Sequence, residues 1–165
     1  MSVEFTYMES PVGRIRIVQS TDGLVEIALG DDLARRKLDA AWRYVENLEC
    51  EATEQLRDYF NHELKEFDVK LVIEGTDFQR TVWLSLADIS YGETMSYGEL
   101  ATKIGRPKAV RAVGAANGRN PIPIILPCHR VIGSDGSLTG YGGGLAVKAE
   151  LLSMERGTAT LPLKL

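Results

Sequence analysis

The stretch Pro127-Cys128-His129-Arg130-Val131 places a thiol beside an imidazole, behind a proline and an apolar run. The preceding residues 120–127 (Asn-Pro-Ile-Pro-Ile-Ile-Leu-Pro) predict an extended, largely buried segment that brings Cys128 to the floor of a cleft. Because adjacent residues on an extended segment point to opposite faces, we expect His129 to reach the thiol through a bend in the chain or through a water. The sequence predicts a nucleophile here, and a buried structural cysteine is the alternative.

Alternating and helical patterns precede this stretch. The first thirty residues alternate apolar and polar side chains and are cut by turn signals at 11–13 and 22–23, which predicts three short antiparallel strands. Residues 31–45 and 52–64 carry apolar residues at helical spacing and are predicted to be helices. Residues 67–73 alternate again and lead to Gly75, where we place a domain boundary.

The fold class that follows is α+β with two domains. Residues 1–74 should form a small antiparallel sheet-plus-helix domain that acts as a scaffold, and residues 75–165 a mostly helical domain. In the second domain, Ser96 and Glu99 form a capping box that begins a helix. Residues 108–117 then form the second helix of a helix-turn-helix, a slim rod of small residues.

The charge of the chain is distributed unevenly. Its net charge is −4, but residues 100–134 hold no Asp or Glu and six positive charges, so the rest of the chain carries −10. The six are Lys103, Arg106, Lys108, Arg111, Arg119 and Arg130. A basic segment on an acidic body can dock on phosphates, because salt screens charges more than about 8 Å away. Ordinary solvated helix faces are the alternative.

The composition of the chain bears on its cellular compartment and on whether it binds a metal. The chain of 165 residues is 44% apolar with no apolar run of the roughly 18 residues that a membrane span needs. Two distant cysteines, Cys50 and Cys128, and an N-terminus without a signal pattern predict a cytoplasmic protein, nucleoid-associated if prokaryotic. Cys50 and His62 are too few for a zinc site, so we expect neither a metal nor a cofactor.

Six blocks of this sequence resemble the O6-alkylguanine-DNA alkyltransferases, suicide DNA-repair proteins. They occur in the family's order between residues 75 and 160. The blocks are Ser96–Ala101, Ala109–Gly114, Asn120–Pro123, Pro127–Val131, Gly140–Leu145 and Lys148–Glu155. The resemblance implies a ribonuclease H-like N-terminal domain and irreversible transfer of an alkyl group from O6-alkylguanine, and from O4-alkylthymine, to Cys128.

The resemblance also implies a role for each catalytic residue. A water-bridged relay of Cys128, His129 and Glu155 would deprotonate the thiol, with Glu155 orienting the imidazole. Tyr97 would donate its hydroxyl proton to guanine N3 so that the base can leave. Asn120 would brace the turn before the cysteine.

The same resemblance implies that the partner is duplex DNA that contains the lesion. We expect the protein to bind it as a monomer, and cooperative assembly along DNA is a further expectation. Arg111 would fill the space of an extruded base, with a simple phosphate contact as its alternative. Tyr97 would crowd the 3′ phosphate. The remaining DNA contacts would come from Ser96, Lys103, Arg106, Lys108 and Arg119. The base pocket would be lined by Pro123, Tyr141, Gly142 and Gly143, with Gly142 where the family often has serine.

Two other functions compete. A lesion binder or helix-turn-helix regulator would recognise damage without repairing it, and such homologues replace the cysteine that this chain retains. A thiol hydrolase using Cys128 and His129 would need an oxyanion hole and would turn over repeatedly.

Overall fold

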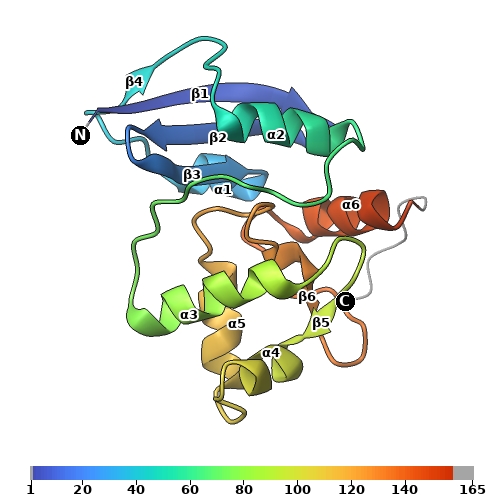
Figure 1. The fold of residues 1–165 in the computed structure, drawn as a ribbon. Coiled ribbons are helices and arrows are strands. Elements are labelled where there is room, and N and C mark those ends of the chain that lie inside the picture. Colours follow the sequence, from blue (N-terminus) through green and yellow to red (C-terminus); the bar gives the residue numbers. More distant parts are fainter. Residues whose placement is uncertain (1, 158–165) are drawn as a thin grey trace. The chain divides into compact units, whose positions relative to one another are not determined.

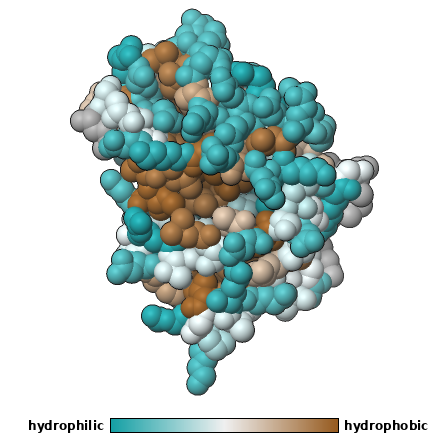
Figure 2. Space-filling model, viewed as in Figure 1, coloured by the Kyte–Doolittle hydropathy of each residue, from teal (hydrophilic) through white to brown (hydrophobic). Residues whose placement is uncertain are grey.

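The computed structural model of the chain describes residues 2–157. Contacts within the chain divide it into two compact units, residues 1–73 and residues 74–165. Hydrophilic residues predominate on the face that Figure 2 shows, with hydrophobic residues visible between them. Within residues 2–157, every helix is too short or too polar to cross a lipid bilayer.

The N-terminal unit is built on a sheet with the strand order β3-β2-β1-β4 (Figure 1). As the turn signals predicted, β1 (Val3–Ser10), β2 (Gly13–Ser20) and β3 (Gly23–Leu29) pair antiparallel. β4 (Arg43–Tyr44) pairs parallel with β1 at the edge of the sheet. β2 supplies much of the core, because its side chains at 15, 17 and 18 have no exposed surface.

The helix α2 (Glu51–Phe60) confirms the second predicted helix, although it ends four residues early. It lies alongside the sheet in Figure 1 and buries Leu56 and Tyr59 completely. The backbone N–H of Cys50 donates to Thr53 Oγ1 at 3.0 Å, so Cys50 occupies the position before the first turn of this helix.

The helix predicted for residues 31–45 is wrong beyond its first turn. Only α1 (Asp31–Arg35) is helical. Asp39 Oδ1 accepts a hydrogen bond from Ala41 N at 2.9 Å, which forms a side-chain-stabilised turn that competes with a helix. Val45 N donates to Phe5 O at 2.9 Å, so the segment pairs with β1 instead. Sheet pairing across the domain therefore overrides the local helical spacing.

The C-terminal unit is mostly helical. It contains α3 (Asp77–Ser85), which a 3-10 turn extends, β5 (Met95–Ser96), α4 (Tyr97–Lys103) and α5 (Val110–Gly118). Ser96 Oγ accepts from Glu99 N at 3.0 Å and Ser96 N donates to Glu99 Oε1 at 3.2 Å, so the predicted capping box begins α4. α4 and α5 form the helix-turn-helix, and Trp83 of α3 anchors α5 by donating Nε1–H to Ala116 O at 2.7 Å.

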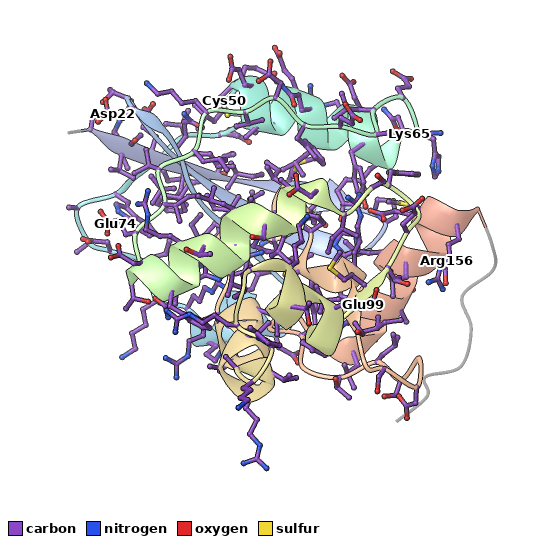
Figure 3. All side chains as sticks on the ribbon, turned by 60° about the horizontal axis from the view of Figure 1, so that its bottom comes forward. Asp22, Cys50, Lys65, Glu74, Glu99 and Arg156 are labelled. Carbon is purple, nitrogen blue, oxygen red and sulfur yellow. The ribbon has the colours of Figure 1, made fainter. Side chains whose placement is uncertain are left out.

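The last part of this unit returns the chain to the same core. A single 3-10 turn, η2 (Cys128–Arg130), leads into β6 (Val131–Ile132), which pairs parallel with β5. A loop then leads to α6 (Leu145–Arg156), whose last residue is labelled in Figure 3, as is Glu99 on α4. The chain thereby brings the start of α4, the turn η2 and the helix α6 together in one unit.

Candidate active site

The segment before Cys128 is buried as predicted, but it is not extended. Ile124 has a positive φ of 74°, and Leu126 N donates to Ile122 O at 3.0 Å, so residues 122–126 turn back on themselves. Cys128 then opens the 3-10 turn η2 and is 3% exposed. The expected alternation of Cys128 and His129 on opposite faces of a strand therefore does not apply, because both residues lie in a tight turn.

Asn120 spans this turn. Its side-chain Nδ2 donates to Leu126 O at 2.6 Å, and its Oδ1 accepts from Ile122 N at 2.9 Å. A buried amide that satisfies both a carbonyl and an amide of the same loop fixes the loop's shape. The backbone that delivers Cys128 is thus held by a side chain eight residues earlier in the sequence.

His129 and Glu155 form a buried pair. His129 Nε2 lies 2.7 Å from Glu155 Oε2, and neither side chain has exposed surface. Because an ionised carboxylate can only accept, Nε2 carries the proton and Nδ1 is left as the acceptor. His129 Nδ1 is buried and has no hydrogen-bond partner within residues 2–157. The imidazole is therefore oriented by Glu155 and presents an open basic nitrogen.

Arg130 completes this cluster and does not face solvent. Its Nε and Nη2 donate to the two oxygens of Glu155 at 2.8 and 2.9 Å, and its Nη1 donates to Ile89 O at 2.6 Å. Arg130 is 5% exposed, so the prediction that it belongs to a phosphate-facing basic set is wrong. A guanidinium that is hydrogen-bonded bidentately to a buried carboxylate has no donor directed outward for DNA.

The charges in the cluster are set by these contacts. Burial alone would raise the pKa of Glu155, but hydrogen bonds from His129 and Arg130 lower it well below its usual range. Burial lowers the pKa of His129, more than the bond to Glu155 raises it. At neutral pH the cluster therefore holds an ionised Glu155, a cationic Arg130 and a neutral His129 that can accept a proton.

Lys148 is a site residue that sequence reasoning missed. It is fully buried, and its Nζ donates to Val131 O at 2.6 Å, to Thr139 O at 2.9 Å and to the Tyr97 hydroxyl oxygen at 3.4 Å. Helical spacing from Leu151 and Glu155 was the available signal, since it places Lys148 on the buried stripe of α6.

Lys148 and Tyr97 both interact electrostatically with Cys128. Burial lowers the pKa of Lys148 to about 8, while the Cys128 charge opposes that shift. Tyr97 begins α4 and donates its hydroxyl to Thr139 O at 2.7 Å. Its pKa is raised, first by burial. A cation and a phenol therefore stand near the thiol, one able to stabilise a thiolate and the other to supply a proton.

The other predicted DNA-contacting residues lie on the helix-turn-helix. The exposed basic side chains there are Lys103, Arg106, Lys108, Arg111 and Arg119. Lys103 pairs with Asp88 at 3.2 Å, and the Arg106 guanidinium lies 6.0 Å from the centre of the Phe78 ring. The exposed residues of α5 beside Arg111 are Val110, Ala112 and Ala115, so Arg111 projects as the one long side chain of that face.

The predicted pocket residues lie on two segments. Pro123 is buried in the turn before Cys128. Tyr141 and Gly142 are half-buried, and Gly143 is buried, in the loop that leads into α6. The first segment leads into the turn η2, which begins with Cys128, and the second leads into α6, which carries Lys148.

Comparison with known proteins identifies the family. The sequence models of two domains match: "6-O-methylguanine DNA methyltransferase, ribonuclease-like domain" over residues 3–73, and the corresponding "DNA binding domain" over residues 77–157. The chain belongs to the 6-O-methylguanine DNA methyltransferase family. Membership confirms the predicted fold class, in which a ribonuclease-like α+β domain precedes a helical domain with a helix-turn-helix.

Relatives within the family match nearly the whole chain. The methylated-DNA–protein-cysteine methyltransferase of Methanosarcina acetivorans is 51% identical over 153 residues, 92% of this chain and 97% of the relative. The protein of that name from Mycolicibacterium paratuberculosis is 47% identical over 154 residues, 93% of each chain. Mycobacterium tuberculosis OGT, solved in complex with DNA, is 45% identical with a TM-score of 0.86 and 93% coverage of both chains.

Proposed function

We propose that this chain is a single-turnover DNA repair protein that transfers the alkyl group of O6-alkylguanine, and of O4-alkylthymine, from duplex DNA to its own Cys128. The observation that carries the proposal is the buried Cys128 thiol in the turn that also holds His129, itself paired with Glu155 at 2.7 Å. The names of the relatives support the same reaction. The lesion-binding alternative is not favoured, because the chain retains the cysteine.

The first half of the reaction is activation of the thiol. A water between Cys128 and His129 Nδ1 passes the thiol proton to the imidazole, whose Nε2–H stays on Glu155. The imidazolium is stabilised by the Glu155 carboxylate, which Arg130 keeps ionised. The Lys148 cation favours the thiolate directly. The nucleophile is therefore generated in a site where burial would otherwise oppose charge.

The second half is departure of the base. Cys128 Sγ forms a bond to the alkyl carbon while the bond from that carbon to O6 breaks, and the electron pair moves into the guanine ring. Tyr97 gives its hydroxyl proton to guanine N3, so that a neutral base leaves. The resulting thioether is stable, so each chain reacts once and no cofactor takes part.

DNA binding is assigned to the helix-turn-helix. α5 enters the minor groove, because its exposed face carries the small residues Ala112 and Ala115, and Val110, with Arg111 as the one long side chain. Arg111 fills the space of the extruded nucleotide, since a thiol cannot reach the alkyl group of a stacked base, while Tyr97 crowds the 3′ phosphate. The phosphates are contacted by Ser96, Lys103, Arg106, Lys108 and Arg119.

The rest of the chain completes the assignment. Pro123, Tyr141, Gly142 and Gly143 line the pocket for the extruded base, with backbone amides near Gly142 in place of a serine hydroxyl. Residues 1–74 form a scaffold domain, and residues 75–165 bind DNA and transfer the alkyl group. The protein works as a monomer in the cytoplasm, with cooperative assembly along DNA as a further expectation.

The test uses a duplex with a single O6-methylguanine and equimolar protein. Cys128→Ala should bind the duplex as the unmodified protein does and leave the methyl group on the DNA. Cys50→Ala is the matched control and should repair normally, because Cys50 lies in the other unit. Repair by Cys128→Ala, or its loss in Cys50→Ala alone, would contradict the assignment.

A further inference from the structure

Asn117 is a buried polar residue that the reaction described above does not use. It lies on the inner face of α5 with Val113 and Ala116 and is 1% exposed. Its Oδ1 is buried and has no hydrogen-bond partner among residues 2–157. A buried acceptor left without a donor is costly, so such a residue needs an explanation other than packing.

The donor side of the same amide faces the reactive cysteine. Asn117 Nδ2 donates to the backbone O of Cys128 at 3.3 Å. Because a carbonyl can only accept, this contact fixes which end of the amide points toward the turn η2. The amide therefore links α5, which bears Arg111 on its outer face, to the residue that receives the alkyl group.

The Tyr97 side chain runs along the same helix. A Cβ added at Gly114 would meet Cδ1 and Cε1 of the Tyr97 ring at 3.8 and 3.9 Å, so the ring lies in van der Waals reach of α5. Gly114 and Asn117 are three residues apart and share a helix face. Burial raises the pKa of Tyr97, and its hydrogen-bond contacts with Thr139 and Asn117 work against that rise. Because the Tyr97 hydroxyl donates to Thr139 O and Asn117 Oδ1 has no hydrogen-bond partner among residues 2–157, the Asn117 atom that acts on the Tyr97 oxygen is Nδ2.

We propose that Asn117 is a positioning residue for the transfer step, which holds the Tyr97 oxygen after that oxygen has given its proton to the departing guanine and keeps it in register with Cys128. The inference rests on the proposed function. As Cys128 Sγ bonds to the alkyl carbon and the carbon–O6 bond breaks, the Tyr97 proton passes to guanine N3 and leaves a phenolate. The two N–H groups of Asn117 Nδ2 serve the Cys128 carbonyl and this oxygen, while Lys148 Nζ approaches it at 3.4 Å.

The test separates leaving groups that need a proton from those that do not. Free O6-benzylguanine loses guanine, which must be protonated, and needs no extrusion from DNA. Iodoacetamide loses iodide, which needs no proton, and alkylates the same thiol. Both reactions are followed at Cys128 by peptide mass spectrometry in a Cys50→Ser background, with kinact and KI measured for O6-benzylguanine.

Asn117→Leu removes the donor at nearly constant volume, and Asn117→Ala serves as a second variant that fits beside Ala115 and Ala116. Both should lower kinact for O6-benzylguanine about tenfold or more, because a hydrogen bond to a developing charge is lost. KI and the iodoacetamide rate should stay within about twofold of those of the parent. Thr6→Val is the matched control: Thr6 Oγ1 is another buried atom that has no partner among the described residues, and its removal should change neither reaction.

Three results with the Asn117 variants, and one with the parent protein, would overturn the inference. Equal losses with both reagents would show a merely structural role, and no loss with either would show no role. A fall confined to KI would mean that Asn117 binds the base and does not hold Tyr97. If the parent protein itself takes no benzyl group from O6-benzylguanine but reacts with iodoacetamide, the proposed function fails, and the inference fails with it.

Discussion

Removal of the Arg130 guanidinium should destabilise the C-terminal unit strongly. Arg130 donates to both oxygens of Glu155, at 2.8 and 2.9 Å, and to Ile89 O at 2.6 Å. Glu155 has no exposed side-chain surface. Arg130→Met would keep the length of the side chain and leave the buried carboxylate facing the neutral donors His129 Nε2 and Gly92 N in place of a cation. Breaking a buried pair in this way costs about 3–5 kcal/mol, a large part of a total stability of roughly 5–15 kcal/mol.

The effect should depend on pH in a defined direction. The pKa of Glu155 is lowered in the folded protein, so its stabilisation is fully present above the unfolded value of about 4.3 and is lost as pH falls below it. The difference between Arg130→Met and the unmodified protein should therefore be full at neutral pH and shrink on acidification through that range. Arg130→Met/Glu155→Gln should cost clearly less than the two single changes together, because no buried charge is left.

Urea unfolding at neutral pH and at several acidic values measures these differences. Lys103→Met is the matched control in the same unit, because its pair with Asp88 is exposed and should contribute only about 0–1 kcal/mol. A cost below about 1 kcal/mol for Arg130→Met at neutral pH, or strict additivity in the double variant, would refute the reasoning.

Three further predictions concern the reactive site. The pKa of Lys148 is lowered to about 8, so the folded chain releases that proton before the unfolded one. The free energy of unfolding should therefore rise as the pH increases from about 8 to about 10. Thermal unfolding measured at several pH values should show this rise in the unmodified protein and not in Lys148→Met. Arg111→Ala should slow repair of duplex O6-methylguanine far more than benzyl transfer from free O6-benzylguanine, and equal slowing of the two rates would exclude a role in extrusion. Alkylation of Cys128, which is 3% exposed, should lower the melting temperature progressively from methyl to benzyl, since overpacking costs about 1–3 kcal/mol. An unchanged melting temperature after benzylation would show that the pocket has room to spare.

The parts of the fold that could be predicted from the sequence are those that contacts between neighbouring residues determine. Ser96 and Glu99 are three residues apart, and their reciprocal hydrogen bonds begin α4 where the sequence places them. The strands β1 to β3 are joined by tight turns, so alternation and turn residues were sufficient. The helix predicted for residues 31–45 failed because residues 43–45 pair with the distant strand β1, which leaves Leu38 43% exposed.

The reactive cluster depends on contacts that no local pattern encodes. Arg130 looks like one more cation of a basic segment, yet its partner Glu155 is 25 residues away and withdraws it from solvent. Lys148 Nζ donates to the hydroxyl of Tyr97, which is 51 residues away in the sequence, and to the backbone carbonyls of Val131 and Thr139. Resemblance to a family supplied Glu155 and Tyr97, but it gave no reason to pair Arg130 with Glu155 or to place Lys148 beside them.

The central claim is that Cys128 accepts the alkyl group once. The most direct test incubates the protein with an excess of duplex that contains one O6-methylguanine, and then measures the intact mass and maps the modified peptide. We expect a gain of a single methyl group per chain, located on Cys128, with no more than one equivalent of guanine restored. A methyl group on Cys50, or restoration of more than one equivalent of guanine per chain, would contradict the account.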